Sequence, residues 1–397
     1  MRIDPAIWSG RPGIERLLDA LDAAHGGARF VGGVVRDALL GLPAKDFDLA
    51  TPHAPDDVVR RLEAKGIKAV PTGIAHGTVT AVSSGTVVEV TTLRCDVSTD
   101  GRRATVAFTG DWAEDAARRD FTINALYADP LSGEVHDYFE GEADIARRRV
   151  RFIGEPLERI AEDHLRILRF FRFHARFGDG EPDAPALAAC AARANDLMAL
   201  SRERIADELI KLLGLPHPAP TVGLMQRHAI LAPVLPELVE HAAAAIAALA
   251  ASERAATVQP DPLRRFAAML PRDPKLASRI AARLKLSKRA RKRLALAADA
   301  DLDLNPNALA YRHGTEGAVD RLLLAGCPAD AAKIAGWPVP RLPIGGGDLI
   351  ARGIAEGPAV ARTLSAIETA WVAADFPSGA SFAELAGRFL PSPGDKR

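Results

Sequence analysis

Hydrophobic and polar positions follow two different patterns along the chain. Between about residues 29 and 137, short runs rich in β-branched residues are separated by Gly, Asp and Ser, which is typical of strands joined by turns. After about residue 140 the strand signals almost vanish, and helical patterns separated by prolines take over. The chain is therefore expected to have a β-containing head followed by an all-helical remainder.

Three stretches of the head carry specific predictions. Residues 29–33 (RFVGG) and 46–51 (DFDLAT) are expected to be short strands on either side of a helix that Gly41 ends. Residues 78–94 predict a β-hairpin, because two β-rich runs surround a Ser-Ser-Gly turn. Residues 98–108 (STDGRRATVAF) are expected to form a mobile, polar loop that returns toward regular structure.

Composition narrows the class of protein. The 397 residues are 48% hydrophobic and carry 51 basic and 51 acidic side chains, so any surface for nucleic acid must be a local patch. The three cysteines lie far apart without CxxC spacing, which favours a reducing compartment. The N-terminus lacks a signal-peptide pattern and the apolar runs are too short to cross a bilayer. We expect a cytoplasmic protein with no membrane partner.

Two carboxylates, Asp46 and Asp48, are candidate metal ligands. On a strand they would share one face while Phe47 turns into the core. Converging carboxylates repel each other unless a cation neutralises them, and Mg²⁺ accepts oxygen ligands while leaving room for substrate phosphates. Glu89, in the second arm of the predicted hairpin, is the candidate third carboxylate. The alternative is a surface turn, because short acidic motifs are common.

The glycine pair before these carboxylates favours the metal site. Gly32 and Gly33 allow backbone to approach a phosphate, and the helix that follows offers free N–H groups. Arg36 adds a charged donor one turn later. In this order, the glycines, the arginine and the two aspartates predict a site for a nucleoside triphosphate held on metal.

Several motifs together resemble one family. The stretches VGGVVRDALLGLPAKDFDLAT, EVTTLR, RRDFTINALY and EDHLRILRFFRF occur in order between about residues 29 and 180. They resemble the class II tRNA nucleotidyltransferases, which include the CCA-adding enzymes and bacterial poly(A) polymerases. The resemblance fades beyond about residue 240.

The resemblance implies roles for individual residues. It implies that Gly33 and Arg36 bind triphosphate, that Asp46 and Asp48 hold the catalytic metals, and that Glu89 is the acidic residue of the following strand. In RRDFTINAL, the motif that selects ribose, it implicates Arg119 in nucleotide binding, Asp120 in organising the site and Asn124 near the sugar. Taken alone, that last motif would be interpreted as a capped helix start.

The segment EDHLRILRFFRF repeats charged residues every three positions. Asp163, Arg166, Arg169 and Arg172 are expected to form one slowly turning stripe on a helix. The alternative is an exposed, ion-paired stripe. Cytosine and adenine both present an amino group beside a ring-nitrogen acceptor, so a carboxylate with a guanidinium suits both bases and rejects uracil and guanine. The resemblance gives Asp163 and Arg166 this templating role.

Two further segments belong to the helical remainder. Residues 201–213 predict a helix capped by Ser201, with a structural role behind the pocket. Residues 278–299 are the densest basic segment and predict a sequence-independent surface for tRNA phosphates, with an ordinary solvated helix face as the alternative. The candidate contacts are Lys285, Lys288, Arg289, Arg291, Lys292 and Arg293.

The expected fold class is α+β, with a nucleotidyltransferase-like mixed β-sheet head followed by a helical neck, body and tail. The expected domains are a helical lead (1–25), the catalytic head (26–140), the base-recognising neck (141–215) and the tRNA-binding body and tail (216–397). The resemblance implies transfer of CMP and AMP from CTP and ATP to the tRNA 3′ end, with Mg²⁺. No side-chain general base is obvious in the sequence.

Four other functions are alternatives to CCA addition. A poly(A) polymerase shares the head, but GIAHGTVTAV resembles the CCA-adding pattern more closely. An enzyme that adds only CC lacks the loop for the final A, whereas residues 95–112 occupy that loop position here. An inactive RNA-binding protein is disfavoured by the intact motifs. His136 and Asp137 lack the companion histidines of a metal-dependent phosphohydrolase.

Overall fold

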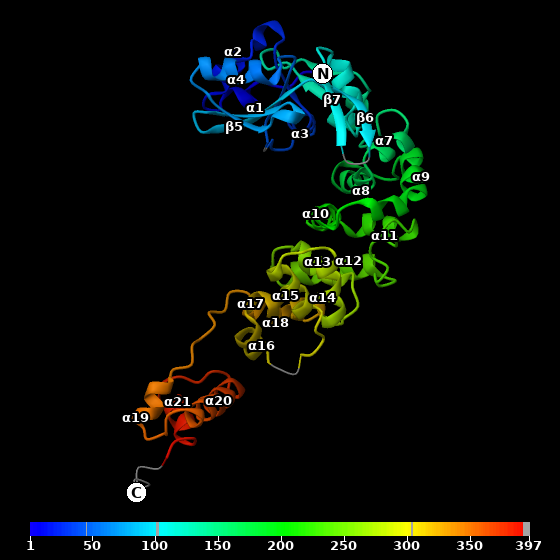
Figure 1. Ribbon diagram of the computed structural model, residues 1–397. Coiled ribbons are helices and arrows are strands. Elements are labelled where there is room, and N and C mark those ends of the chain that lie inside the picture. The colour runs from blue at the N-terminus through cyan, green and yellow to red at the C-terminus, as the bar shows by residue number, and fades with distance from the viewer. Residues whose placement is uncertain (45, 101–102, 303–304, 392–397) are drawn as a thin grey trace. The chain divides into compact units, whose positions relative to one another are not determined.

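The computed structural model describes residues 1–44, 46–100, 103–302 and 305–391, with the side chains of residues 96–106 left out. The chain divides into two compact units, Met1–Pro236 and Glu237–Arg397 (Figure 1). The expected boundaries near residues 140 and 215 fall inside the first unit and near its end, and that finer division stays a prediction.

The first unit is built on a seven-stranded mixed sheet. Its strand order is β3-β4-β5-β2-β1-β8-β9, with one parallel pair, β2–β5, and antiparallel pairs elsewhere. This arrangement confirms the predicted α+β class. The strands are β1 (Arg29–Val31), β2 (Asp48–Thr51), β3 (Lys68–Gly73), β4 (Thr78–Ser83), β5 (Thr86–Thr92), β8 (Leu126–Ala128) and β9 (Val135–Asp137).

The predicted hairpin is present, and the predicted loop is not. Ser84 and Gly85 both have positive φ (51° and 86°) between β4 and β5, the turn geometry that matches strand twist. The loop predicted at the start of 98–108 is wrong for the described residues, because β6 (Arg94–Asp100) and β7 (Arg103–Phe108) pair as an antiparallel ribbon. The predicted return to regular structure corresponds to β7. Alternating Val, Thr and Ala suit such pairing. Residues 101 and 102 of that loop lie outside the described residues.

Helices make up the rest of the first unit. The α-helices are α1 (Ala6–Ser9), α2 (Ile14–Ala20), α3 (Gly33–Leu39), α4 (Pro55–Ala64), α5 (Trp112–Ala117), α6 (Gly141–Ala146), α7 (Pro156–Glu162), α8 (Leu165–Phe177), α9 (Ala184–Ala192), α10 (Arg202–Leu213) and α11 (Ala219–Arg227). The 3₁₀ turns are η1 (Ala23–His25), η2 (Ile74–His76), η3 (Thr122–Asn124) and η4 (Ala194–Ala199). Gly41 (φ 67°) follows the end of α3, and Ser201 caps α10 by accepting from Arg204 N, as predicted.

Two groups of aromatic side chains fix the core of this unit. Trp8 of the N-terminal lead is fully buried with its ring 4.5 Å from Phe30, which meets Phe47 edge-on at 6.0 Å. The Arg11 guanidinium lies 3.9 Å from the centre of the Phe47 ring. On the helical side, Phe121, which precedes η3, lies 5.1 Å from Phe173 of α8. The helical side thereby packs directly against the head.

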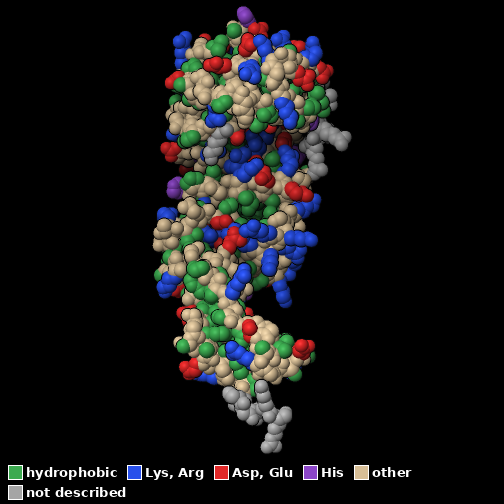
Figure 2. Space-filling view, turned by 90° about the vertical axis from the view of Figure 1, so that its left-hand side faces the viewer, with side chains coloured by type: hydrophobic (Ala, Val, Ile, Leu, Met, Phe, Trp, Pro, Cys, Tyr) green, Lys and Arg blue, Asp and Glu red, His purple; other side chains and the backbone are tan. Residues whose placement is uncertain are grey.

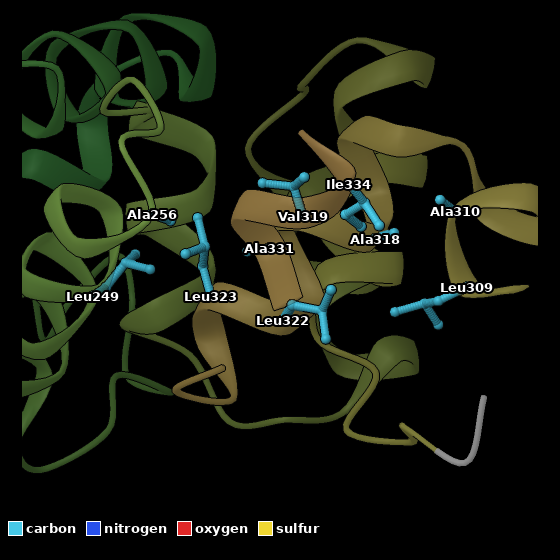
Figure 3. Packing of buried hydrophobic residues seen from close by; sticks show 10 residues of the cluster. All are labelled: Leu249, Ala256, Leu309, Ala310, Ala318, Val319, Leu322, Leu323, Ala331 and Ile334. Carbon is cyan, nitrogen blue, oxygen red and sulfur yellow. The ribbon is translucent and has the colours of Figure 1, made fainter. Parts of the chain in front are cut away.

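The second unit contains helices only, among its described residues. They are α12 (Ala242–Ala255), α13 (Pro262–Ala268), α14 (Pro274–Arg283), α15 (Lys288–Ala297), α16 (Pro306–His313), α17 (Thr315–Leu324), α18 (Pro328–Ile334), α19 (Gly346–Ala351), α20 (Pro358–Ala373) and α21 (Gly379–Gly387). One core gathers Leu249, Leu309, Leu322 and Ile334 from α12, α16, α17 and α18 (Figure 3). A second core unites α19–α21 with α16 around Trp371.

The basic segment is not one helix. α14 ends at Arg283 and α15 begins at Lys288, with Lys285 at φ 54° between them and Ser287 accepting from Ala290 N. Serine is a strong helix-capping residue, which explains the restart. No helix among the described residues has the length and apolarity needed to cross a membrane, and all three cysteines are free.

Replacing Gly85 by Ala is expected to destabilise the β4–β5 hairpin by about 1 kcal/mol, because a Cβ at positive φ is strained. Gly10→Ala is the matched control: both positions have nothing within 4 Å of an added Cβ, but Gly10 has φ −71°. Native-state hydrogen exchange of the β4 and β5 amides measures the difference. Equal exchange in the two variants would contradict the assigned turn geometry.

Candidate active site

The parallel pair β2–β5 brings the candidate metal ligands together. Its register places Asp48 opposite Glu89, and Phe47 is buried as predicted (4% exposed). Asp46 lies before β2 instead of within it, because the strand begins at Asp48. The expected strand alternation therefore applies to Asp48 and Ala50, while Asp46 is carried by the preceding loop.

The three carboxylates act on one another electrostatically. Burial raises the pKa of Asp48 to about 6, with further contributions from Glu89 and Asp46, while Arg119 opposes the rise. Within the described residues, no three His, Cys, Asp or Glu side chains form a complete metal cluster. A hard-oxygen set of one or two carboxylates fits Mg²⁺, which takes its remaining ligands from water and substrate phosphates.

The glycine turn lies beside a second candidate residue. Gly32 adopts φ 71°, ψ −117° just before α3, a conformation that favours glycine. A Cβ there would lie 3.5 Å from Arg119 Nη1 and 3.6 Å from the Asn124 carbonyl oxygen. At Gly33, a Cβ would lie 3.6 Å from Arg36 Nη2. The turn is thus adjacent to both arginines that were expected to bind nucleotide.

Arg36 is buried beneath this turn and already has protein partners. Its Nε and Nη2 donate to Asp37 Oδ1 at 2.8 and 2.7 Å, and Nη1 donates to Asn124 Oδ1. The guanidinium also lies 4.1 Å from the centre of the Phe177 ring. Arg36 is only 6% exposed, so it contributes positive charge to the glycine turn from inside the protein.

Asp120 connects the head to α8. Its Oδ1 accepts from the Phe121 amide and from Asn124 Nδ2, both at 2.9 Å, and its Oδ2 accepts from Arg169 Nε at 2.8 Å. Burial alone would raise the pKa of Asp120, but Arg169 and Asn124 outweigh it and the pKa is lowered. Asp120 is therefore held as a carboxylate that organises Asn124.

The predicted stripe of charged residues is interrupted at its start. α7 ends at Glu162 and α8 begins at Leu165, so Asp163 lies in the break with extended backbone instead of on the helix. The Asp163 carboxylate accepts from the amide of Leu165, the first residue of α8, at 3.1 Å, a local side-chain-to-backbone bond that aspartate favours. Its other oxygen accepts from Arg204 Nη2 at 2.7 Å.

The arginines of the stripe also contact protein groups. Arg166 bonds to the Glu162 carboxylate and donates Nη2 to the Arg118 carbonyl at 3.1 Å. Arg172 Nε donates to Glu208 Oε2 at 2.6 Å. Asp163 and Arg166 thus lie close in sequence, but each has a different partner in the structure.

Several residues of this site were missed by sequence reasoning. These missed residues are the charged partners of the predicted site residues. They are Asp37, Asp115, Glu162, Arg204 and Glu208. Arg204 and Glu208 are one turn apart on α10, and Asp115 is one turn before Arg119. The i, i+4 spacing was visible, but the sequence does not reveal which distant side chain each charge would meet.

The candidate tRNA contacts lie in the second unit. Arg293 is 14% exposed and pairs with Asp261, Glu316 and Asp320, so it offers little to a phosphate. Arg289 lies 3.5 Å from Glu316, and Arg291 Nε donates to Ser278 Oγ at 2.8 Å. Figure 2 shows Lys and Arg side chains gathered in patches on the visible face.

Family comparisons match two regions of the chain. Residues 28–151 match the poly A polymerase head domain, and residues 182–241 match a probable RNA- and SrmB-binding site of polymerase A. CCA tRNA nucleotidyltransferase 1, mitochondrial, of Mus musculus is 44% identical over 204 residues, 51% of this chain and 47% of that protein. The CCA-adding enzyme of Lacticaseibacillus paracasei is 43% identical over 200 residues, 50% of this chain and 48% of that protein. The chain thus matches about half the length of these curated relatives.

Solved structures resemble a larger share of the chain. The CCA-adding enzyme of Bacillus stearothermophilus in complex with CTP covers 95% of this chain and 98% of its own, with TM-score 0.74 and 29% identity. The match to the Thermotoga maritima CCA-adding enzyme complexed with tRNA covers 98% of this chain and 96% of that one, with TM-score 0.70. At 19% identity, this match shows similarity of fold alone.

Asp48→Asn is expected to stabilise the metal-free protein at pH 8. The folded-state pKa of about 6 lies above the unfolded value, so the stability that protonated Asp48 contributes is lost as pH rises through 6. The variant should gain on the order of 1–2 kcal/mol at pH 8, allowing for partial solvent screening, and nothing at pH 4. Thermal melts across this pH range measure the gap.

Adding Mg²⁺ with CTP at pH 8 should reduce that gap, because only the wild-type site holds the cation well. Asp56→Asn, an exposed carboxylate of α4, is the control and should change the melting temperature little. A constant gap from pH 4 to pH 8 would contradict the electrostatic account of Asp48.

Proposed function

We propose that the chain is a member of the class II CCA-adding enzyme and poly(A) polymerase family and that it adds CCA to the 3′ end of tRNA. The matches to the poly A polymerase head domain and to CCA-adding enzymes support this proposal. CTP and ATP would supply CMP and AMP, with release of pyrophosphate. One observation supports the proposal most directly. Asp48 lies opposite Glu89 in the strand register and interacts electrostatically with Arg119, and Arg119 lies beside the Gly32 turn. A metal site and a phosphate site would thus be adjacent.

The chemistry would use few protein groups. The tRNA 3′-hydroxyl is the nucleophile, and it attacks the α-phosphate as pyrophosphate leaves. Mg²⁺ held by Asp46 and Asp48 would supply charge neutralisation and a lower pKa for that hydroxyl. The Gly32 and Gly33 backbone would approach the triphosphate, and Arg119 would donate to it from the side. Asp120 and Asn124 would orient the ribose.

Base selection is assigned to Asp163 and Arg166. A carboxylate that accepts from the amino group and a guanidinium that donates to the ring nitrogen would accept cytosine and adenine. In the structure Arg204 and Glu162 hold these two side chains, so the base edge would replace protein partners. Arg169 and Arg172 would support the same surface through Asp120 and Glu208.

The remaining assignments are also proposals. The tRNA body would contact the second unit through Lys285, Lys288, Arg289, Arg291 and Lys292, and Arg293 would support them from beneath. Mg²⁺ is the proposed metal, and the unpaired cysteines support a reducing compartment, which we propose to be the cytoplasm. The Mus musculus relative is named as mitochondrial.

Other functions have less support. Poly(A) polymerase shares the head, and the relatives named above are CCA-adding enzymes. A CC-adding enzyme would lack the segment that here forms the β6–β7 ribbon. A phosphohydrolase site at His136 and Asp137 has no support, because the Asp137 carboxylate accepts from the amides of Phe139, Gly141 and Glu142 and so caps a turn.

The first test uses tRNA transcripts that end at the discriminator base, in C, or in CC. Each is incubated with Mg²⁺ and CTP, ATP or both, and products are sized on a sequencing gel. We expect CC with CTP alone and one final A when ATP is present. Long A tails would identify a poly(A) polymerase, and growth that stops at CC would identify a partial enzyme.

Asp46→Ala separates catalysis from binding. The variant should lose transfer while it retains tRNA affinity, because its carboxylate is proposed to serve the metal alone. Asp56→Asn, an exposed carboxylate in the first turn of α4, is the control for transfer. Loss of tRNA binding together with transfer would contradict this assignment.

Asp163→Ala should relax base selection, since the carboxylate that rejects uracil would be absent. The preference for CTP over UTP should fall by about tenfold or more, measured as the ratio of incorporation rates. Asp207→Ala, a 60% exposed carboxylate of α10, is the matched control. An unchanged preference would exclude Asp163 from base reading.

A further inference from the structure

Asp115 of α5 is the most heavily bonded carboxylate near the proposed site. It is 1% exposed, and its two oxygens serve different groups. Oδ1 accepts from Arg118 Nε and Nη2 at 2.9 and 2.6 Å and from the Arg94 amide at 3.2 Å. Oδ2 accepts from Arg119 Nη2 at 3.0 Å and from the Tyr127 hydroxyl at 2.6 Å.

This bonding orients Arg119. Arg119 Nε donates to both Asp115 Oδ2 (3.3 Å) and the Tyr127 hydroxyl (3.2 Å), so two of its three nitrogens are fixed by one carboxylate and one phenol. The third, Nη1, has no acceptor among the described residues and is the atom that lies beside Gly32. A guanidinium held by one edge presents its other edge in a fixed direction.

Asp115 is held in its ionised form. Burial would raise its pKa, but Arg119 and Arg118 outweigh that effect and keep the pKa below its usual value. An ionised, fully bonded carboxylate holds its partners more firmly than a neutral amide would. The Arg94 amide opens β6, so the same carboxylate also fixes the base of the β6–β7 ribbon.

We propose that Asp115 is a positioning residue, which fixes the Nη1 edge of Arg119 toward the triphosphate beside Gly32 and ties that arginine to the base of the ribbon. The inference rests on the proposed function, because it presumes a nucleotide at the glycine turn. Arg119 faces the turn that is proposed to bind the triphosphate, which CTP and ATP share. Loss of its orientation is therefore expected to weaken the binding of both nucleotides equally.

The test measures the Kd of CTP and of ATP, each with Mg²⁺, by calorimetry on the full chain, and KM and kcat with the tRNA transcripts. Asp115→Asn should raise Kd and KM about tenfold for both nucleotides, the equivalent of one charge-assisted hydrogen bond, and change kcat less. Combined with Arg119→Gln, it should add nothing to the effect of Arg119→Gln alone.

Arg118→Gln is the matched control, because it removes the other arginine from the same carboxylate; nucleotide Kd should stay within about twofold of wild type.

Tyr127→Phe is the milder variant if Asp115→Asn folds poorly, and it should raise Kd for both nucleotides in the same direction. The inference is overturned if Asp115→Asn and Tyr127→Phe bind both nucleotides like wild type, or if the losses add to that of Arg119→Gln. A wild type that binds CTP and ATP without extending tRNA overturns the proposed function instead.

Discussion

Burial of one carboxylate beside two others is the constraint on which the candidate site depends. The parallel pairing of β2 with β5 places Asp48 opposite Glu89, and Asp46 lies just before the same strand. Burial of Asp48, with smaller contributions from the charges of Glu89 and Asp46, raises its pKa to about 6. Ionising Asp48 in this place therefore costs the metal-free fold stability that an apolar residue would not cost.

Nearly every other charge around the site is compensated inside the protein. Arg36 is matched by Asp37, Arg169 by Asp120 and Arg172 by Glu208. Burying a charged pair costs desolvation free energy. In return it fixes the orientation of the arginine, because a guanidinium bonded along one edge cannot rotate freely. Among the described residues, no ion pair is found for Asp46, Asp48 or Glu89, and this contrast distinguishes the candidate site from the residues that support it.

The sequence predicted the local structure well where local chemistry decides it. The Gly32 turn, the hairpin at Ser84 and Gly85, and the cap at Ser201 follow from residues within a few positions. The head-plus-helices division followed from hydrophobic periodicity. The glycines, the acidic pair and the ordered motifs together also indicated which residues to examine for function.

The failures occurred where structure depends on distant partners. The ribbon formed by β6 and β7 was taken for a loop, because polar residues masked a pairing that either strand alone would not reveal. Asp163 lies outside the predicted stripe, in the break before α8, where its carboxylate accepts from the Leu165 amide and from Arg204 of α10. Lys285 and Ser287 divided the basic helix in two. Which charges would pair across 40 or more residues was not readable from spacing.

The packing of the N-terminal lead has a consequence for how the protein can be handled. Trp8 lies against Phe30, Phe30 against Phe47, and Arg11 covers the Phe47 ring. Phe47 separates Asp46 from Asp48, so the first dozen residues form the floor beneath the acidic pair. Removing Trp8 and Arg11 by trimming the chain would therefore disturb the candidate metal ligands, although these lie more than thirty positions away in sequence.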